Sequence, residues 1–105
     1  MAFSIVTREF GVARLAIEGQ LDATTIWALQ RELSTLLRRH PNRVEVDVSG
    51  LSLIDTSGVG LLLSFFKKLS AQGGLLMVSG LRDQPLALFA LLKLERLFAG
   101  STPSN

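Results

Sequence analysis

The most telling part of the chain reads Leu51-Ser52-Leu53-Ile54-Asp55-Thr56-Ser57-Gly58. A helical pattern follows it directly, and the apolar residues expected on its buried side are Val59, Leu62, Leu63, Phe66 and Leu69. The pair Gly73-Gly74 marks the end of this helix, because glycine is common just after a helix C-terminus. The stretch therefore predicts a junction between a strand and a helix, where the first backbone N–H groups of the helix lack intrahelical partners.

Strand and helix patterns alternate on both sides of this junction. Residues 43–48 alternate strictly between valine and polar side chains, which predicts a strand that is central in its sheet because helical patterns flank it. Residues 75–78 predict a further strand. A last helix is expected to begin at Asp83, with this residue as its cap and Pro85 in its first turn, and residues 86–92 are apolar nearly all round.

The first forty residues predict a hairpin and then an amphipathic helix. Alternating patterns lie on both sides of a turn near Phe10-Gly11, as in paired strands. Asp22 is expected to cap the helix, which ends before Pro41 because proline disfavours the helical conformation of the residue before it. The apolar stripe of this helix consists of Ile26, Leu29, Leu33, Leu36 and Leu37. Strands separated by helices after an opening hairpin predict an α/β fold with a mixed sheet.

Length and composition limit the chain to one globular domain. It has 105 residues, of which 48% are hydrophobic and 19% charged. It contains no cysteine, which excludes disulfides, thiolate metal ligands and a cysteine nucleophile. The net charge of +2 is too small to indicate a nucleic-acid partner. We expect a cytoplasmic protein without membrane insertion, because no export signal is visible and the apolar runs are shorter than the ~18 residues of a membrane span.

The segment Asp55-Thr56-Ser57-Gly58 is suited to carry a phosphate. Free N–H groups and the helix dipole favour an anion at a helix N-terminus, so a phosphate on Thr56 or Ser57 is compatible with an intact helix. A modification that adds roughly two negative charges can release a partner that covers the site with an acidic or apolar surface. The alternative needs no function: Asp55 or Thr56 is a helix cap, and Gly58 relieves close packing.

Residues 46–60, with Glu18-Gly19-Gln20-Leu21-Asp22 before them and Gly73-Gly74-Leu75 after them, resemble the STAS domain. The resemblance extends over residues 1–99 and leaves 100–105 as a flexible tail. It implies a STAS-like mixed sheet of four to five strands with an N-terminal hairpin, flanked by three to four helices. Within this superfamily, the chain is most similar to the bacterial anti-sigma factor antagonists. Their usual phosphoacceptor follows the aspartate of an Asp-Ser-[Ser/Thr]-Gly motif.

That similarity implies a partner-switching regulator that is not an enzyme. The unphosphorylated chain would bind an anti-sigma factor that is a serine kinase of the histidine-kinase-like ATPase type, and phosphorylation would release it. A phosphatase is an optional further partner. Thr56 stands where the family usually has serine, so the resemblance implies phosphorylation at Thr56 or at Ser57 beside it. The implied partner-binding residues are Asp22, Asp55, Thr56, Ser57 and Gly58. No catalytic residue, metal or cofactor is expected, because ATP and Mg²⁺ would belong to the kinase.

A second function is compatible with the same resemblance. Stand-alone STAS proteins similar to this chain also dock on the ATPase of lipid-trafficking ABC transporters. The apolar last helix and the threonine at position 56 favour this alternative, whereas Asp22 in its Gly-Gln-Leu-Asp context and Ser57 favour the antagonist.

Four other features have weaker functional interpretations. His40, the only histidine, lies beside a proline in a polar loop and is expected at the surface. Asp22, Asp47 and Asp55 could together form a Mg²⁺ pocket as in a receiver domain, but the receiver fold does not begin with a hairpin. Asp47 is expected to have a structural role. Trp27 fits a core position by its spacing, yet exposure near Asp22 would indicate an interface anchor. The basic cluster is either a solvated helix face or a surface that steers an acidic partner, and it consists of Arg31, Arg38, Arg39 and Arg43.

Overall fold

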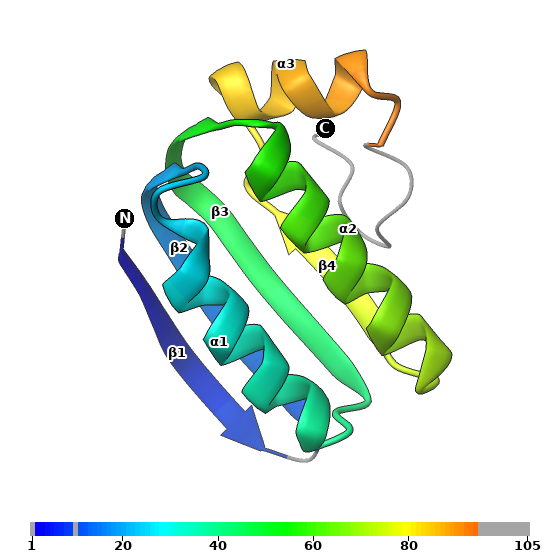
Figure 1. Cartoon of the computed structure of the whole chain (residues 1–105). Coiled ribbons are helices and arrows are strands. Elements are labelled where there is room, and N and C mark those ends of the chain that lie inside the picture. The colour runs from blue at the N-terminus through cyan, green and yellow to red at the C-terminus, as the bar shows by residue number, and fades with distance from the viewer. Residues whose placement is uncertain (1, 10, 95–105) are drawn as a thin grey trace.

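The computed structural model describes residues 2–9 and 11–94, which form one sheet and the helices that pack on it (Figure 1). The elements follow the order β1 (Ala2–Glu9), β2 (Val12–Leu21), α1 (Ile26–Arg38), β3 (Arg43–Ile54), α2 (Thr56–Ala71), β4 (Leu75–Ser79) and α3 (Asp83–Leu91). The predicted hairpin and the helix-linked strands are confirmed. The expected tail, residues 100–105, lies outside the described residues.

The sheet has four strands in the order β1-β2-β3-β4. The hairpin strands β1 and β2 pair antiparallel, whereas β2 with β3 and β3 with β4 pair parallel, so the sheet is mixed as predicted. The strand predicted over residues 43–48 is central, but it continues to Ile54. Figure 1 shows α1 and α2 side by side on one face of the sheet, both starting at the edge where β2 and β3 end.

The hydrophobic core lies between the sheet and the two helices α1 and α2. Alternate residues of β2 and β3 point into it, and α1 contributes the stripe of Leu29, Leu33 and Leu36. On α2 the prediction was wrong at two positions, because Leu63 and Phe66 are only half-buried; Phe65, which was not in the predicted set, is buried instead. The remaining members of this core are Ala13, Leu15, Ile17, Leu21, Val44, Val46, Val48, Leu51, Ile54, Val59, Leu62, Leu69, Leu76, Val78, Leu81 and Phe89.

Two predicted helix caps were also wrong. Helix α1 begins at Ile26 with Thr25 as its N-cap residue, three residues later than an Asp22 cap implies, because the Asp22 carboxylate organises the preceding loop instead. Helix α3 begins at Asp83 as predicted, but its N-cap residue is Arg82, and Asp83 lies inside the first turn with a φ of 53°. Among the described residues, no helix combines the length and apolar character needed to cross a bilayer.

Helix α3 completes the open side of β3. Strand β4 pairs with β3 only from Arg43 to Asp47, so the second half of β3 has no strand neighbour there. Gln84 takes this place: its Oε1 accepts the Ile54 N–H at 2.9 Å, and its Nε2 donates to the Ile54 carbonyl at 2.9 Å. Two backbone groups next to the predicted functional segment therefore depend on one amide side chain.

We expect Gln84→Ala to lower the free energy of unfolding by about 1–3 kcal/mol, because it leaves both partly buried Ile54 groups without their partner. Urea unfolding followed by circular dichroism measures this change. The control is Gln30→Ala on the exposed side of α1, for which we expect a change within about 0.5 kcal/mol. Equal changes for the two variants would contradict the role of Gln84.

Candidate functional site

The candidate site lies at the edge of the sheet where β2 and β3 end together. Leu21 and Ile54 are paired in the sheet, and each is followed directly by an aspartate. Parallel neighbours bring their carboxyl ends to the same edge, so Asp22 and Asp55 belong to one site although they are distant in sequence. We call Asp22, Asp55, Thr56, Ser57 and Gly58 the switch site.

Asp55 joins the two halves of the switch site. It is the N-cap residue of α2 in extended conformation, and its Oδ1 accepts the Gly58 N–H at 3.0 Å. Its other oxygen, Oδ2, accepts the Ala23 N–H at 3.3 Å from the loop between β2 and α1. Its backbone N–H donates to the Leu21 carbonyl at 3.1 Å. Of the two caps that the sequence left open, Asp55 and Thr56, the structure has Asp55, and the same carboxylate also holds the neighbouring loop.

Asp22 organises the loop on the other side of the site. Its Oδ1 accepts the Thr24 N–H at 2.9 Å and the Thr24 hydroxyl at 2.6 Å. These hydrogen bonds stabilise the carboxylate and lower the pKa of Asp22, first of all through the Thr24 side chain. The Thr25 hydroxyl accepts the backbone N–H of Asp22 at 2.9 Å, which closes the loop before α1 begins.

The two predicted phosphoacceptors differ in exposure. Thr56 is the first residue of α2 and is exposed, whereas Ser57 is half-buried. Within the described part of the chain, neither hydroxyl has a hydrogen-bond partner, and the backbone N–H groups of these two residues are also unbonded. The helix therefore presents Thr56 beside two free N–H groups at its positive end.

Gly58 lies where a side chain does not fit. A Cβ atom at this position would come within 2.7 Å of Ile54 Cγ1 and 2.9 Å of both Leu21 Cγ and the Leu21 carbonyl oxygen. The glycine thus lets the first turn of α2 approach the ends of β2 and β3 closely. The structure supports the predicted packing role of Gly58.

Several contributors to the switch site were not predicted from the sequence. Thr24 stands two residues after an aspartate, a spacing typical of turns closed by an aspartate side chain, and this signal was available. The N–H of Ala23 and the amide of Gln84 gave no signal, because their roles depend on neighbours 32 and 30 residues away.

The other candidate residues lie elsewhere. His40 is exposed in the loop after α1, and Asp47 Oδ1 accepts the Ser49 N–H at 2.9 Å, which is the structural role expected for it. No cluster of three or more carboxylate or histidine side chains suited to a metal ion occurs in the residues described. Trp27 has 65% of its surface exposed, so it is not a core residue, and its exposure is the feature expected of an interface anchor.

Gly58→Ala should lower the free energy of unfolding by about 1–3 kcal/mol, since the new methyl group overlaps backbone and buried side chains. The matched control is Gly60→Ala in the same helix, where a Cβ meets nothing within 4 Å. This control should raise the stability by about 0.5–1 kcal/mol through helix propensity. Thermal unfolding of both variants provides the measurement, and destabilisation by Gly60→Ala alone would refute the packing argument.

NMR titration of the Asp22 carboxyl group should give a pKa below the usual value of 3.8. A carboxyl whose pKa is lower in the folded state adds stability above its unfolded pKa, and this is lost as the pH falls through the folded value. Thr24→Val removes the hydroxyl donor and should raise the pKa of Asp22 toward 3.8, whereas Thr35→Val on α1 should not move it. If the pKa of Asp22 is the same in Thr24→Val as in the wild-type chain, the hydrogen bond from the Thr24 hydroxyl is not the cause of the lowered pKa.

The comparisons with known proteins agree with this geometry. Residues 5–99 match the family model described as "Mlab, STAS domain". The anti-sigma-F factor antagonist RsfB of Mycobacterium tuberculosis is 28% identical over 91 residues, which cover 85% of this chain and 75% of RsfB.

Solved structures show the same fold. An anti-sigma factor antagonist from Mycobacterium paratuberculosis has a TM-score of 0.81 at 19% identity, covering 93% of this chain and 84% of its own. The Bacillus cell fate determinant SpoIIAA in its phosphorylated form has a TM-score of 0.75 at 21% identity, covering 97% and 93%. Since the family model spans nearly the whole sequence, the chain belongs to the STAS domain family.

Proposed function

We propose that this chain is a cytoplasmic partner-switching regulator of the anti-sigma factor antagonist type. In its unphosphorylated form it binds an anti-sigma factor that is also a serine kinase of the histidine-kinase-like ATPase type. Phosphorylation at the switch site releases it. The observation that carries the proposal is the exposed Thr56 hydroxyl, free of hydrogen bonds within the described residues, at the first position of a helix whose cap Asp55 also holds the adjacent loop.

The relatives support this assignment of role. RsfB is named as an anti-sigma-F factor antagonist, and SpoIIAA is described in a phosphorylated form. The difference in exposure favours Thr56 over Ser57 as the phosphoacceptor, because a kinase must reach the hydroxyl oxygen. In the reaction, the Thr56 oxygen forms a bond to the γ-phosphorus of ATP, ADP leaves, and the hydroxyl proton is released.

Electrostatics explains how the modification acts on the partner. The switch site already carries the carboxylates of Asp22 and Asp55, and a phosphothreonine adds roughly two further negative charges. Free N–H groups and the helix dipole at the start of α2 compensate part of this charge within the chain. A partner that covers the site has no such compensation. It loses affinity through repulsion and through the cost of desolvating the phosphate.

The alternative function is a STAS subunit that docks on the ATPase of a lipid-trafficking ABC transporter. Leu91 and Leu92 at the end of α3 favour it, because they expose 76% and 41% of their surfaces and offer an apolar contact. In that case the switch site is a constitutive contact, and charge at Thr56 blocks assembly without any phosphorylation of the native chain.

Phosphorylation of the chain by its co-purifying ATPase and Mg-ATP, mapped by mass spectrometry, tests the proposal. We expect phosphate on Thr56, its loss in Thr56→Ala, and release of the ATPase by Thr56→Glu in a pull-down. Ser70→Glu places the same charge on an exposed serine at the far end of α2 and should retain the partner.

Two results would contradict the proposal. One is full phosphorylation of a variant that lacks both the Thr56 and the Ser57 hydroxyls. The other is an ATPase that remains bound to Thr56→Glu as firmly as to Ser70→Glu. Recovery of a membrane permease with the ATPase, and no phosphate on the chain, would favour the transporter subunit.

A further inference from the structure

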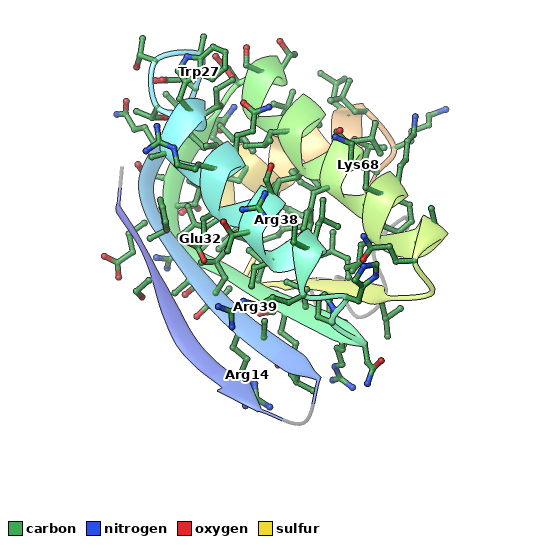
Figure 2. All side chains as sticks on the ribbon, turned by 60° about the horizontal axis from the view of Figure 1, so that its bottom comes forward. Arg14, Trp27, Glu32, Arg38, Arg39 and Lys68 are labelled. Atoms are coloured by element: carbon green, nitrogen blue, oxygen red, sulfur yellow. The ribbon has the colours of Figure 1, made fainter. Side chains whose placement is uncertain are left out.

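The exposed side of α1 presents an aromatic residue and two arginines in one line. Trp27, Arg31, Ser34 and Arg38 are separated by four, three and four residues, a spacing that places them on one face of a helix. We call these four residues the α1 face. They line a shallow groove together with Gln30. In Figure 2, Trp27 lies near the start of α1 and Arg38 near its other end.

The positive charge of the α1 face is not neutralised by the chain itself. In the part of the chain that the structure describes, neither Arg31 nor Arg38 has an acidic partner; the ion pairs there join Arg14 and Arg43 to Glu45. Arg38 Nη2 donates to the Thr35 hydroxyl at 3.1 Å, so its own helix orients the guanidinium and leaves its charge available. Arg38, which is oriented and has no acidic partner, is therefore ready to bind an acidic group.

The adjacent groove continues this surface toward α2. It lies between the two helices, is lined by Gln30 and Ser34 from α1, and reaches Lys68 on α2. Figure 2 shows Lys68 on the helix next to Arg38. A ligand on the α1 face therefore meets a third basic side chain across the groove.

We propose that the α1 face binds an acidic segment of a partner protein, with Trp27 as its apolar anchor. Tryptophan and arginine are the residue types that contribute most at protein interfaces. Trp27 is 65% exposed, so a partner can bury much of its ring, and the two arginines beyond it select carboxylates. This surface is separate from the switch site, and the proposal does not rest on phosphorylation of Thr56.

The observations favour a protein segment over a membrane or a nucleic acid. Membrane-bound helices need a continuous apolar face, and the α1 face has a single large apolar side chain among polar ones. Nucleic acids bind through many phosphate contacts, yet Asp22 and Asp55 lie at the sheet edge where α1 begins and repel a long polyanion. A short segment can place its carboxylates at Arg31 and Arg38 and an apolar side chain on Trp27, so that its negative charges stay away from that edge.

Trp27 is the only tryptophan, so its fluorescence reports this surface directly. Four probes are titrated into the full chain: a synthetic glutamate-rich peptide with a few leucines, the same peptide with lysine in place of glutamate, phosphatidylglycerol vesicles, and duplex DNA. We expect the glutamate peptide alone to shift the emission to shorter wavelength, and its affinity to fall as salt is added.

Charge-reversal variants test the residues, with circular dichroism as the check of folding. Arg31→Glu and Arg38→Glu should each weaken peptide binding about fivefold, because charge reversal removes an exposed charge pair and adds a repulsion in its place. Lys93→Glu, at an exposed position just after α3, changes the net charge by the same amount as Arg31→Glu. It should weaken peptide binding less than about twofold. Thr56→Glu should leave peptide binding unchanged, which separates this proposal from the phosphorylation switch.

Three outcomes would overturn the proposal. The first is an emission shift with vesicles or DNA but not with the glutamate peptide. The second is no shift with any probe. The third is equal weakening by Lys93→Glu and Arg31→Glu, because binding would then follow net charge and not the α1 face.

Discussion

The carboxylate of Asp55 connects two segments that the sequence separates widely. One oxygen holds the Gly58 N–H at the start of α2, and the other holds the Ala23 N–H in the loop before α1. The N–H of Asp55 itself continues the pairing between β2 and β3 by one residue. As a result, the loop before α1, the junction between β3 and α2 and the first turn of α2 are held together by hydrogen bonds of one residue. Thr56, the first residue of α2, presents its hydroxyl from this connected part of the chain.

Charge is distributed unevenly over the surface around this support. The edge where β2 and β3 end carries Asp22 and Asp55, whereas the α1 face, which begins at the same edge, carries Arg31 and Arg38. A partner that covers both surfaces needs basic groups opposite the acidic edge and acidic groups opposite the α1 face. Such complementary charges determine how the partner is oriented more than how tightly it binds. A phosphate on Thr56 would change the acidic edge and leave the α1 face as it is.

Local patterns in the sequence predicted most of the fold but not its long-range contacts. Strand alternation, the apolar stripe of the first helix and the acidic cap at Asp55 are properties of neighbouring residues, and all three are confirmed. Asp22 was predicted as a helix cap, yet Thr24 competes for its carboxylate, and the helix starts later. The amide of Gln84 beside Ile54 depends on where β4 stops pairing, which no local pattern reveals.

Amide hydrogen exchange of Ala23 and Gly58 in Asp55→Asn and Asp55→Ala tests the central claim most directly. An asparagine can still accept the Gly58 N–H through its carbonyl oxygen, but its amino group cannot accept the Ala23 N–H. We therefore expect faster exchange at Ala23 in both variants, and at Gly58 only in Asp55→Ala. Exchange at Ala23 that stays the same in the wild-type chain and both variants would show that Asp55 does not join the two loops.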